Sequence, residues 1–291
     1  MNHLVHRIVV RDAPDEKYHA DDHFVLDLTH DAYAIPAIAA YADACEAEYP
    51  LLAADLRDKI AAKITAASEF ITVPETTLPN GTVVPAFMVS RYLASKGPAG
   101  LPLSVPHAAP WVEINFNDAK EACERINGKL ITETQALSIA WNISQQDINW
   151  TGGKVGEGKL YQGLHKGTVS SAQPGDYEPS DAEERRWHQL STGERIYDFA
   201  GNAYTLVFDD VQGDENGLIA KPFADDSVSI QAPYPSMEKG MGWRPEAGAN
   251  WSGYALVRGG YWASESSAGA FYLAYGWPDF EHSYVGFRCT Q

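Results

Sequence analysis

The chain has 291 residues, and 45% of them are apolar, which is enough for one large domain with an appendage or for two domains. Acidic residues outnumber basic ones by 39 to 22, and the formal net charge of -17 argues against nucleic acid as a partner, because a phosphate backbone is repelled. No apolar run approaches the roughly 20 residues that span a bilayer, so we expect no membrane insertion.

The N-terminal part is predicted to be a small appendage, either α/β or helical. Its start lacks a basic head, an apolar middle and a small-residue cleavage site, so we expect no secretory signal. Residues 4–10 and 23–29 are β-branched or alternating and predict strands. Pro36 and Pro50 fit the first position of two successive helices, where a missing N–H does no harm. The second helix has one apolar stripe, formed by Leu52, Leu56, Ile60 and Ile64.

A turn signal separates this appendage from the rest of the chain. Pro79, Asn80 and Gly81 follow one another, and we place the boundary there, between an appendage at 1–78 and a second domain at 79–291. The appendage is predicted to attach or oligomerise the second domain.

Two helices are predicted in the second domain, at about 116–127 and 133–145. The first opens at Asn115, and the second opens at Thr132 with Gln135 three residues later, which is a capping-box pattern. The remainder, from 146 to 291, is rich in Gly, Trp, Pro and Asn and predicts irregular loops around a few strands.

The usual templates for catalysis and metal binding find little support. Gly153–Lys159 (GKVGEGK) has the spacing of a phosphate loop, but Leu160 stands where Ser or Thr must hold magnesium, so a surface loop is favoured. A group of His and Asp residues matches no zinc spacing and favours an exposed acidic turn: His19, Asp21, Asp22, His23 and His30. Adjacent carboxylates diverge and make weak acid/base candidates: Asp209 with Asp210, and Glu183 with Glu184. We expect no catalytic residue, metal or cofactor.

Cysteine and aromatic residues are distributed differently along the chain. Cys45, Cys123 and Cys289 are too few and too scattered for a disulfide framework or a zinc site, and Cys45 is interpreted as a small buried hydrophobe. Aromatic residues gather near the C-terminus. Eight of the 24 residues from 261 to 284 are aromatic, about three times the share of 11% in the whole chain.

Five motifs occur in order across residues 85–291. They are F-x-x-x-x-Y from Phe87 to Tyr92, C-x-x-x-x-G-x-L-x-T-E from Cys123 to Glu133, G-N-x-x-x-x-x-x-D from Gly201 to Asp209, R-G-G-x-W from Arg258 to Trp262, and G-F-R from Gly286 to Arg288. In this order they resemble the C-type lectin fold of the formylglycine-generating-enzyme type. The resemblance implies an α+β, loop-rich fold for the part of the chain that follows the small N-terminal appendage.

The catalytic groups of that enzyme are missing at the matching positions. Its two reactive cysteines fall at Ser264 and Gly269, a downstream arginine falls at Gly276, and the acidic residue of a calcium motif falls at Thr205. Without thiolates there is neither a soft copper site nor a redox nucleophile. We therefore expect a binding protein rather than an enzyme.

The chain resembles the variable proteins of diversity-generating retroelements more closely still. Their R-G-G-x-W motif is followed by A-G-x-F-x-L, which matches Ala268, Gly269, Phe271 and Leu273. In that family the remaining positions are recoded by adenine-directed mutagenesis. The resemblance implies a ligand-binding surface in the variable segment 261–284, made of Tyr261, Ala263, Ser264, Ser267, Tyr272, Ala274, Gly276, Trp277, His282, Ser283 and Tyr284. The implied scaffold positions are Asn202, Arg258, Gly259, Gly260, Trp262, Gly286, Phe287 and Arg288, with both arginines bonded to loop carbonyls.

Strand alternation predicts which side chains of this segment are displayed. Phe271, Leu273 and Tyr275 share one face, which we expect to be buried, and the face with Tyr272, Ala274 and Gly276 is expected to be displayed. Trp262 and Phe271 are predicted to be core residues, whereas Trp277 lies in a turn-like context and is predicted to be exposed. Exposed Tyr and Trp rings supply large contact areas at low entropic cost.

The resemblance also implies partners and a location. The ligand is a protein or glycan on a cell surface, and the chain forms a homo-oligomer, with a trimer in a phage tail fibre as one arrangement. The location is a phage virion or the bacterial cytoplasm. The family geometry brings Cys123 close to Cys289, as a disulfide or as reduced neighbours. Two alternatives stay open: an oxidoreductase of the formylglycine-generating-enzyme superfamily, and a carbohydrate-binding lectin of fixed specificity.

Overall fold

The computed structural model describes residues 26–291. The predicted strand at 4–10 and the residues His19, Asp21, Asp22 and His23 lie outside this range. The predicted strand at 23–29 is wrong where it is described, because residues 26–29 form coil and turn. Here Asp27 accepts hydrogen bonds from the backbone of Thr29 and from the ring of His30, which closes a local turn.

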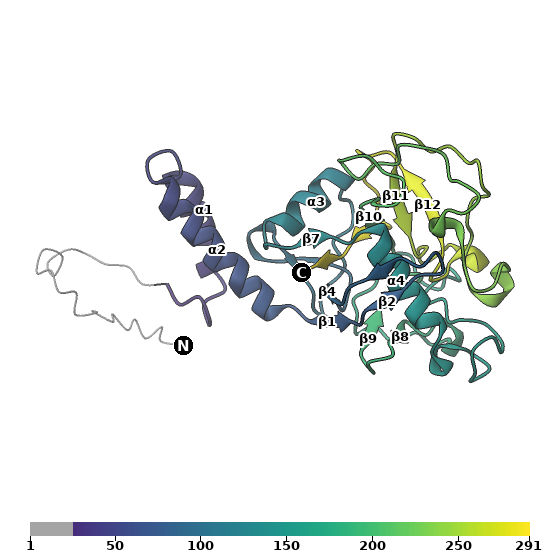
Figure 1. Cartoon of the computed structure of the whole chain (residues 1–291). Coiled ribbons are helices and arrows are strands. Elements are labelled where there is room, and N and C mark those ends of the chain that lie inside the picture. The colour runs from purple at the N-terminus through teal and green to yellow at the C-terminus, as the bar shows by residue number, and fades with distance from the viewer. Residues whose placement is uncertain (1–25) are drawn as a thin grey trace, which may run out of the picture. The chain divides into compact units, whose positions relative to one another are not determined.

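Contacts divide the chain into two compact units, residues 1–60 and 61–291, and the predicted boundary at 78/79 falls within the second unit. The helices α1 (Ala34–Cys45) and α2 (Pro50–Ala67) follow one another (Figure 1), and α2 runs across the division. Pro50 begins α2 as predicted, whereas Pro36 is the third residue of α1. The third position still belongs to the first turn, where backbone N–H groups have no partner within the helix.

The two helices of the first unit are joined by small side chains and an ion-pair network. Ala42 and Ala53 are fully buried. The Arg57 guanidinium lies 2.9 Å from Asp43 and 2.9 Å from Glu46. The predicted stripe on α2 is buried only in part, because Ile60 and Ile64 are 2% exposed but Leu52 is 40% exposed. Cys45, expected to be buried, is partly exposed.

The second unit contains a four-stranded sheet in the order β1-β4-β14-β7. Its strands are β1 (Phe70–Val73), β4 (Phe87–Ser90), β7 (Lys129–Leu130) and β14 (Cys289–Thr290). The pairing of β14 places the C-terminal residues inside this sheet, between two strands from the first half of the chain.

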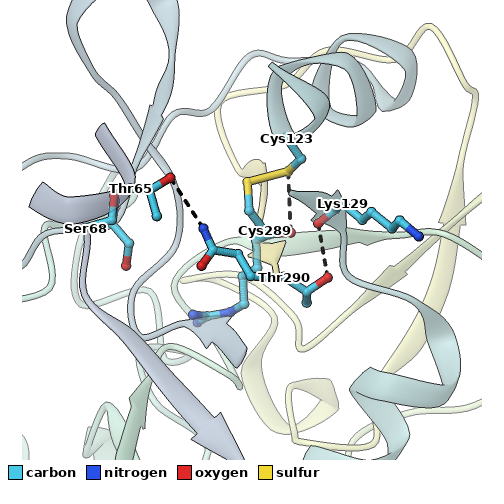
Figure 2. Close-up of a disulfide and its surroundings, with 9 residues drawn as sticks. Thr65, Ser68, Cys123, Lys129, Cys289 and Thr290 are labelled. Carbon is cyan, nitrogen blue, oxygen red and sulfur yellow. Dashed lines mark hydrogen bonds between the residues drawn. A yellow bond between two sulfur atoms is a disulfide. The ribbon is translucent and has the colours of Figure 1, made fainter. Parts of the chain in front are cut away.

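Cys123 and Cys289 form a disulfide, with their Cα atoms 5.5 Å apart. Figure 2 shows that this bond joins helix α3 (Phe116–Glu124) to β14. Next to it, the Thr290 hydroxyl donates a hydrogen bond to the carbonyl oxygen of Lys129 at 3.3 Å. The disulfide and the strand pairing therefore hold the same two C-terminal residues.

A second four-stranded sheet has the order β12-β11-β10-β13. Its strands are β10 (Tyr204–Val207), β11 (Ala255–Arg258), β12 (Leu273–Gly276) and β13 (Val285–Phe287). Only the β10–β13 pair is parallel. Three small hairpins complete the strands: β2 (Thr76–Thr77) with β3 (Val83–Val84), β5 (Ser95–Lys96) with β6 (Pro102–Leu103), and β8 (Trp187–Gln189) with β9 (Arg195–Tyr197).

The two helices predicted for the second unit are present, with the predicted caps. The Asn115 side chain accepts a hydrogen bond from the backbone of Asp118, and α3 ends at Glu124, three residues before the predicted end at 127. The chain turns away there, and Asn127 adopts a positive φ of 58°. Helix α4 (Glu133–Ser144) begins with the predicted capping box of Thr132 and Gln135.

Long loops and short 3-10 helices occupy most of 146–291, as predicted. The glycine-rich segment 153–159 is a surface turn, in which Gly153, Gly156 and Gly158 all have positive φ. The α+β class, the loop-rich C-terminal part and the helical N-terminal part match the prediction. Within residues 26–291, no helix combines the length and apolarity needed to cross a membrane.

A buried ion pair connects α4 to the second sheet. Glu133, at the start of α4, is 0% exposed, and its carboxylate accepts hydrogen bonds from both Nε and Nη2 of Arg258, the former at 2.6 Å. Arg258 also donates to the carbonyl oxygen of Ser229 at 3.1 Å and more weakly to that of Phe271. A bidentate geometry with extra carbonyl acceptors is what a desolvated guanidinium requires.

Arg288 is buried as well, but it is bonded only to carbonyl oxygens. It donates to Ser90 at 3.1 Å, to Arg91 at 3.2 Å and to Tyr197, so it joins the C-terminus to β4 and β9. Asn202 has a similar role, since its side chain donates to the carbonyl oxygen of Gln173 and to Asp198. These contacts hold the loops around Gln173 and Asn202 and the end of β9 in place.

We predict that Glu133→Gln lowers the free energy of unfolding by about 3–5 kcal/mol, because Arg258 loses its counter-charge while it stays buried. Urea unfolding of the full chain measures this. The control is Glu183→Gln in the same unit, which weakens an exposed pair with Lys166 and leaves the midpoint nearly unchanged. Equal midpoint shifts for the two variants would contradict the role given to the buried pair.

Candidate functional site

The segment 261–284 is held at both ends by the second sheet. It leaves β11 through Gly259 and Gly260, which have φ of 91° and 89°. A Cβ atom at Gly260 would lie 2.8 Å from the Cα of Ala268, so this turn has no room for a larger residue. The segment then supplies β12 and returns into β13 at Val285.

Four tyrosine rings from two parts of the chain, strand β10 and the segment 261–284, lie together, and we call them the tyrosine cluster: Tyr204, Tyr261, Tyr272 and Tyr284. The Tyr204 ring is central, with ring centroids 5.1 Å from Tyr261, 5.5 Å from Tyr272 and 5.6 Å from Tyr284. The hydroxyl oxygens of Tyr204 and Tyr272 are 3.1 Å apart and share a hydrogen bond. His282 stacks on Tyr284 at 3.6 Å. Three of the predicted ligand-binding residues, Tyr261, Tyr272 and Tyr284, thus lie together around Tyr204, and His282 lies against the last of them.

Three phenols of the cluster are held in the neutral form. Burial raises the pKa of Tyr261, Tyr272 and Tyr284 above the ordinary tyrosine value, and the neighbouring Tyr204 adds to the effect in each case. These three residues therefore offer rings and neutral hydroxyls, which suits hydrogen bonding and aromatic contact rather than proton abstraction.

A second group of rings, which we call the aromatic row, lies beside the cluster: Trp243, Trp251, Tyr254, Tyr275 and Trp277. Ring centroids are 6.3 Å apart for Trp243–Trp251, 4.6 Å for Trp251–Tyr275, 4.7 Å for Tyr254–Tyr275 and 4.3 Å for Tyr254–Trp277. The row is exposed, by 40% at Trp243, 46% at Tyr275 and 60% at Trp277. Trp243 is 6.4 Å from Tyr272, so the row and the cluster are continuous.

The predicted alternation along 271–276 is wrong at two positions. Tyr272, expected to be displayed, is 7% exposed, and Tyr275, expected to be buried, is 46% exposed. Strand β12 begins only at Leu273, and the ring of Tyr272 packs on Tyr204 while Gly242 lies against its backbone. At the other end of β12, Tyr275 rests on the rings of the aromatic row instead of entering the core.

The other predicted ligand-binding residues lie at the surface to different degrees. Trp277 and Ser283 are exposed, whereas the rest are half-buried: Tyr261, Ala263, Ser264, Ser267, Ala274, Gly276, His282 and Tyr284. Ser264 and Ser267 are engaged in their own turn, since Ser264 Oγ accepts from the backbone of Tyr261 and Ser267 Oγ donates to the carbonyl oxygen of Ser264. Most of the predicted scaffold is buried: Asn202, Arg258, Gly259, Gly260, Gly286, Phe287 and Arg288. Trp262 is half-buried.

Sequence reasoning missed the residues of this surface that lie outside 261–284. Trp243, Trp251 and Tyr254 come from a loop rich in Gly, Pro and Asn that ends at β11, and Tyr204 begins β10. A usable signal was present, because three aromatic residues within 243–254 lie among turn-forming residues. Nothing in one sequence indicates that this loop packs beside 261–284.

Ser264 and Gly269 stand where the sequence resemblance places the two reactive cysteines of the formylglycine-generating enzyme, and Gly269 is packed against the backbone of Gly242. Thr205, at the position of the calcium motif, is 6% exposed and pairs with Arg258 between β10 and β11. Across residues 26–291, no three His, Cys, Asp or Glu side chains are placed to share a metal ion.

The neighbouring carboxylates diverge, as expected. Asp209 is buried and accepts hydrogen bonds from the backbone of Val211 and Gln212, whereas Asp210 bonds to Thr134 at the start of α4. Burial raises the pKa of Asp209 to about 6. Glu184 is buried too, and it accepts hydrogen bonds from the backbone of His165 and Lys166 and from the Thr168 hydroxyl, while Glu183 bonds to the Lys166 side chain. Each carboxylate thus has a structural contact of its own.

A groove of about 450 Å³ lies elsewhere, between β2 and the C-terminal half of α4. Its lining includes Thr76, Trp141 and Gln145 and no residue of 261–284. It is therefore separate from the aromatic surface.

A scan against protein-family models and a search of curated proteins find no match for this chain. Similar solved structures include variable protein 1 of Treponema denticola, with 12% identity and a TM-score of 0.36, covering 77% of this chain and 94% of that one. They also include CarF, with 12% identity and a TM-score of 0.41, covering 77% and 98%. The M1 variant of the Major Tropism Determinant has 14% identity and a TM-score of 0.35, and the match covers 74% of this chain and 51% of that one.

We predict that Tyr272→Ala destabilises the protein by about 3–5 kcal/mol, because it removes a buried ring and leaves a cavity beside Tyr204. Trp277→Ala is expected to cost less than about 1 kcal/mol, since most of that ring is already in water. Urea unfolding compares the two. A larger loss for the Trp277 variant would contradict the placement of these side chains.

We predict that Asp209→Asn removes part of the pH dependence of stability. The pKa of Asp209 is raised in the folded state, so its contribution is fully present below the unfolded value of 3.8 and is lost as the pH rises to about 6. Relative to the parent protein, the free energy of unfolding of the variant should rise by about 2 kcal/mol between pH 4 and pH 7. Unfolding curves across this range measure the gain, and parallel curves for the two proteins would contradict it.

Proposed function

We propose that this chain is a non-catalytic ligand-binding protein whose C-terminal surface is diversified by a retroelement. One observation carries the proposal: a continuous set of tyrosine and tryptophan rings, exposed along the aromatic row, is built around the segment 261–284. Soluble monomers rarely keep so many large rings in water without a partner. Rigid aromatic side chains are also the preferred anchors of binding surfaces.

The different burial of the residues expected to be constant and of those expected to vary supports diversification of the segment 261–284. The residues expected to be constant, such as Arg258 and Arg288, are buried and hydrogen-bonded. Those expected to vary lie at least partly at the surface, except for Tyr272. A surface of this kind accepts substitutions without loss of the fold, which a mutagenic mechanism requires.

The N-terminal part, 1–78 in the sequence prediction, serves in this proposal to attach or oligomerise the binding domain. A homo-oligomer, with a trimer as one arrangement, adds avidity to individually weak sites when the target on a cell surface is multivalent. The ligand is a cell-surface protein or glycan. The site of action is a phage virion, as a tail receptor-binding protein, or the bacterial cytoplasm.

The test is the pattern of variation among sister isolates. We expect substitutions in the gene to concentrate at the half-buried and exposed positions of 261–284 and to spare Arg258, Gly259 and Gly260. We also expect a reverse-transcriptase gene nearby. Uniform drift along the chain would instead favour a lectin of fixed specificity, and a stoichiometric metal in the purified protein would favour an oxidoreductase.

A further inference from the structure

The charge around the aromatic row restricts the kind of ligand that fits. Between residues 240 and 284 there are four carboxylates, all exposed: Glu246, Glu265, Asp279 and Glu281. The same stretch has no lysine and two arginines. The surface therefore combines uncharged rings with negative charge.

Both arginines of this stretch are engaged within the protein. Arg258 is paired with Glu133 in the core. Arg244 donates to the carbonyl oxygens of Ile230 at 3.1 Å, Gly242 at 3.0 Å and Pro235 at 3.4 Å. Neither guanidinium is free to meet an anionic ligand.

Two of the carboxylates lie close in the sequence to rings of the aromatic row. Glu246 follows Trp243 by three residues, and Asp279 lies between Trp277 and Phe280 in a turn closed by the Phe280 amide and the Trp277 carbonyl. Glu265 follows directly on the turn in which the Ser264 backbone N–H donates to the carbonyl oxygen of Tyr261. Burial is the largest cause that raises the pKa of Tyr261, and the charge of Glu265 adds to it.

Within residues 26–291 these carboxylates have no cationic partner. Among the described residues, Glu246, Glu265 and Asp279 take part in no ion pair with a Lys, Arg or His side chain. Glu281 accepts a hydrogen bond only from the neutral amide of Asn115 at 3.1 Å. Their charge is therefore available to a ligand.

We propose that the partner meets the aromatic row with a basic protein surface rich in lysine and arginine; this rests on the proposed function. The face of an aromatic ring attracts cations, and it does so more strongly when the contact is removed from water. The aliphatic stems of Lys and Arg pack on the same rings while their charged groups reach the carboxylates at the edge. An anionic glycan or a phosphate polymer meets only repulsion here, in a chain with a net charge of -17.

The test uses a labelled oligolysine peptide as the probe and measures its binding to the full chain by fluorescence anisotropy. We expect binding that weakens with added salt. We expect a loss of about tenfold in affinity in Trp277→Leu and in the triple variant Glu246→Gln, Glu265→Gln, Asp279→Asn. A control triple variant neutralises exposed carboxylates elsewhere in the second unit, Glu124→Gln, Glu157→Gln and Glu178→Gln, and removes the same charge. The affinity of this control variant for the peptide should fall by less than about threefold.

Equal losses for the two triple variants would overturn the proposal, because the peptide would then respond only to net charge. Unchanged affinity in Trp277→Leu would also overturn it, because the rings would take no part. Binding of neutral dextran that depends on Trp277 would assign the row to a glycan instead. Any of these results leaves the proposed function standing, since that depends on the pattern of variation among isolates.

Discussion

The ion pair between Glu133 and Arg258 is the contact on which the aromatic surface depends. Removing both charges from water is costly, and the pair persists because the guanidinium is met by a bidentate carboxylate and by loop carbonyls at once. Arg258 is the last residue of β11, and the turn at Gly259 and Gly260 follows directly. The start of the segment 261–284 is therefore fixed to helix α4.

Other buried arginines of the second unit are hydrogen-bonded in a similar way. Arg288 donates to carbonyl oxygens of two separate segments. Arg186 pairs with Asp198, which also accepts a hydrogen bond from the Asn202 side chain. A unit with so many loops has few ladder hydrogen bonds, so buried side-chain donors must satisfy the loop carbonyls. Because these donors are interior, they hold the loops in place independently of the exposed rings such as Trp277.

Local sequence rules predicted local features well. The caps at Asn115 and Thr132 and the loop-rich C-terminal part all follow from neighbouring residues. The errors arise where distant segments meet. Alternation placed Tyr272 outside and Tyr275 inside because it assumes a strand with one covered face, but Tyr204 and Gly242 cover Tyr272, and Trp251 and Tyr254 hold Tyr275 at the surface. The contribution of Trp243 could not be predicted, since it depends on packing across about 30 residues of irregular chain.

The position of β14 has a consequence for biosynthesis. Its residues Cys289 and Thr290 pair with β4 and β7, so the first sheet stays incomplete until the ribosome has added the residues after β13. This sheet therefore cannot be completed while the chain is still being synthesised up to β13. Its formation depends on contacts between residues far apart in the sequence, and such contacts form slowly. A premature stop codon anywhere in 261–284 removes both β13 and β14. The truncated chain lacks at least one strand of each four-stranded sheet, so we expect it to stay unfolded and to be degraded by proteases.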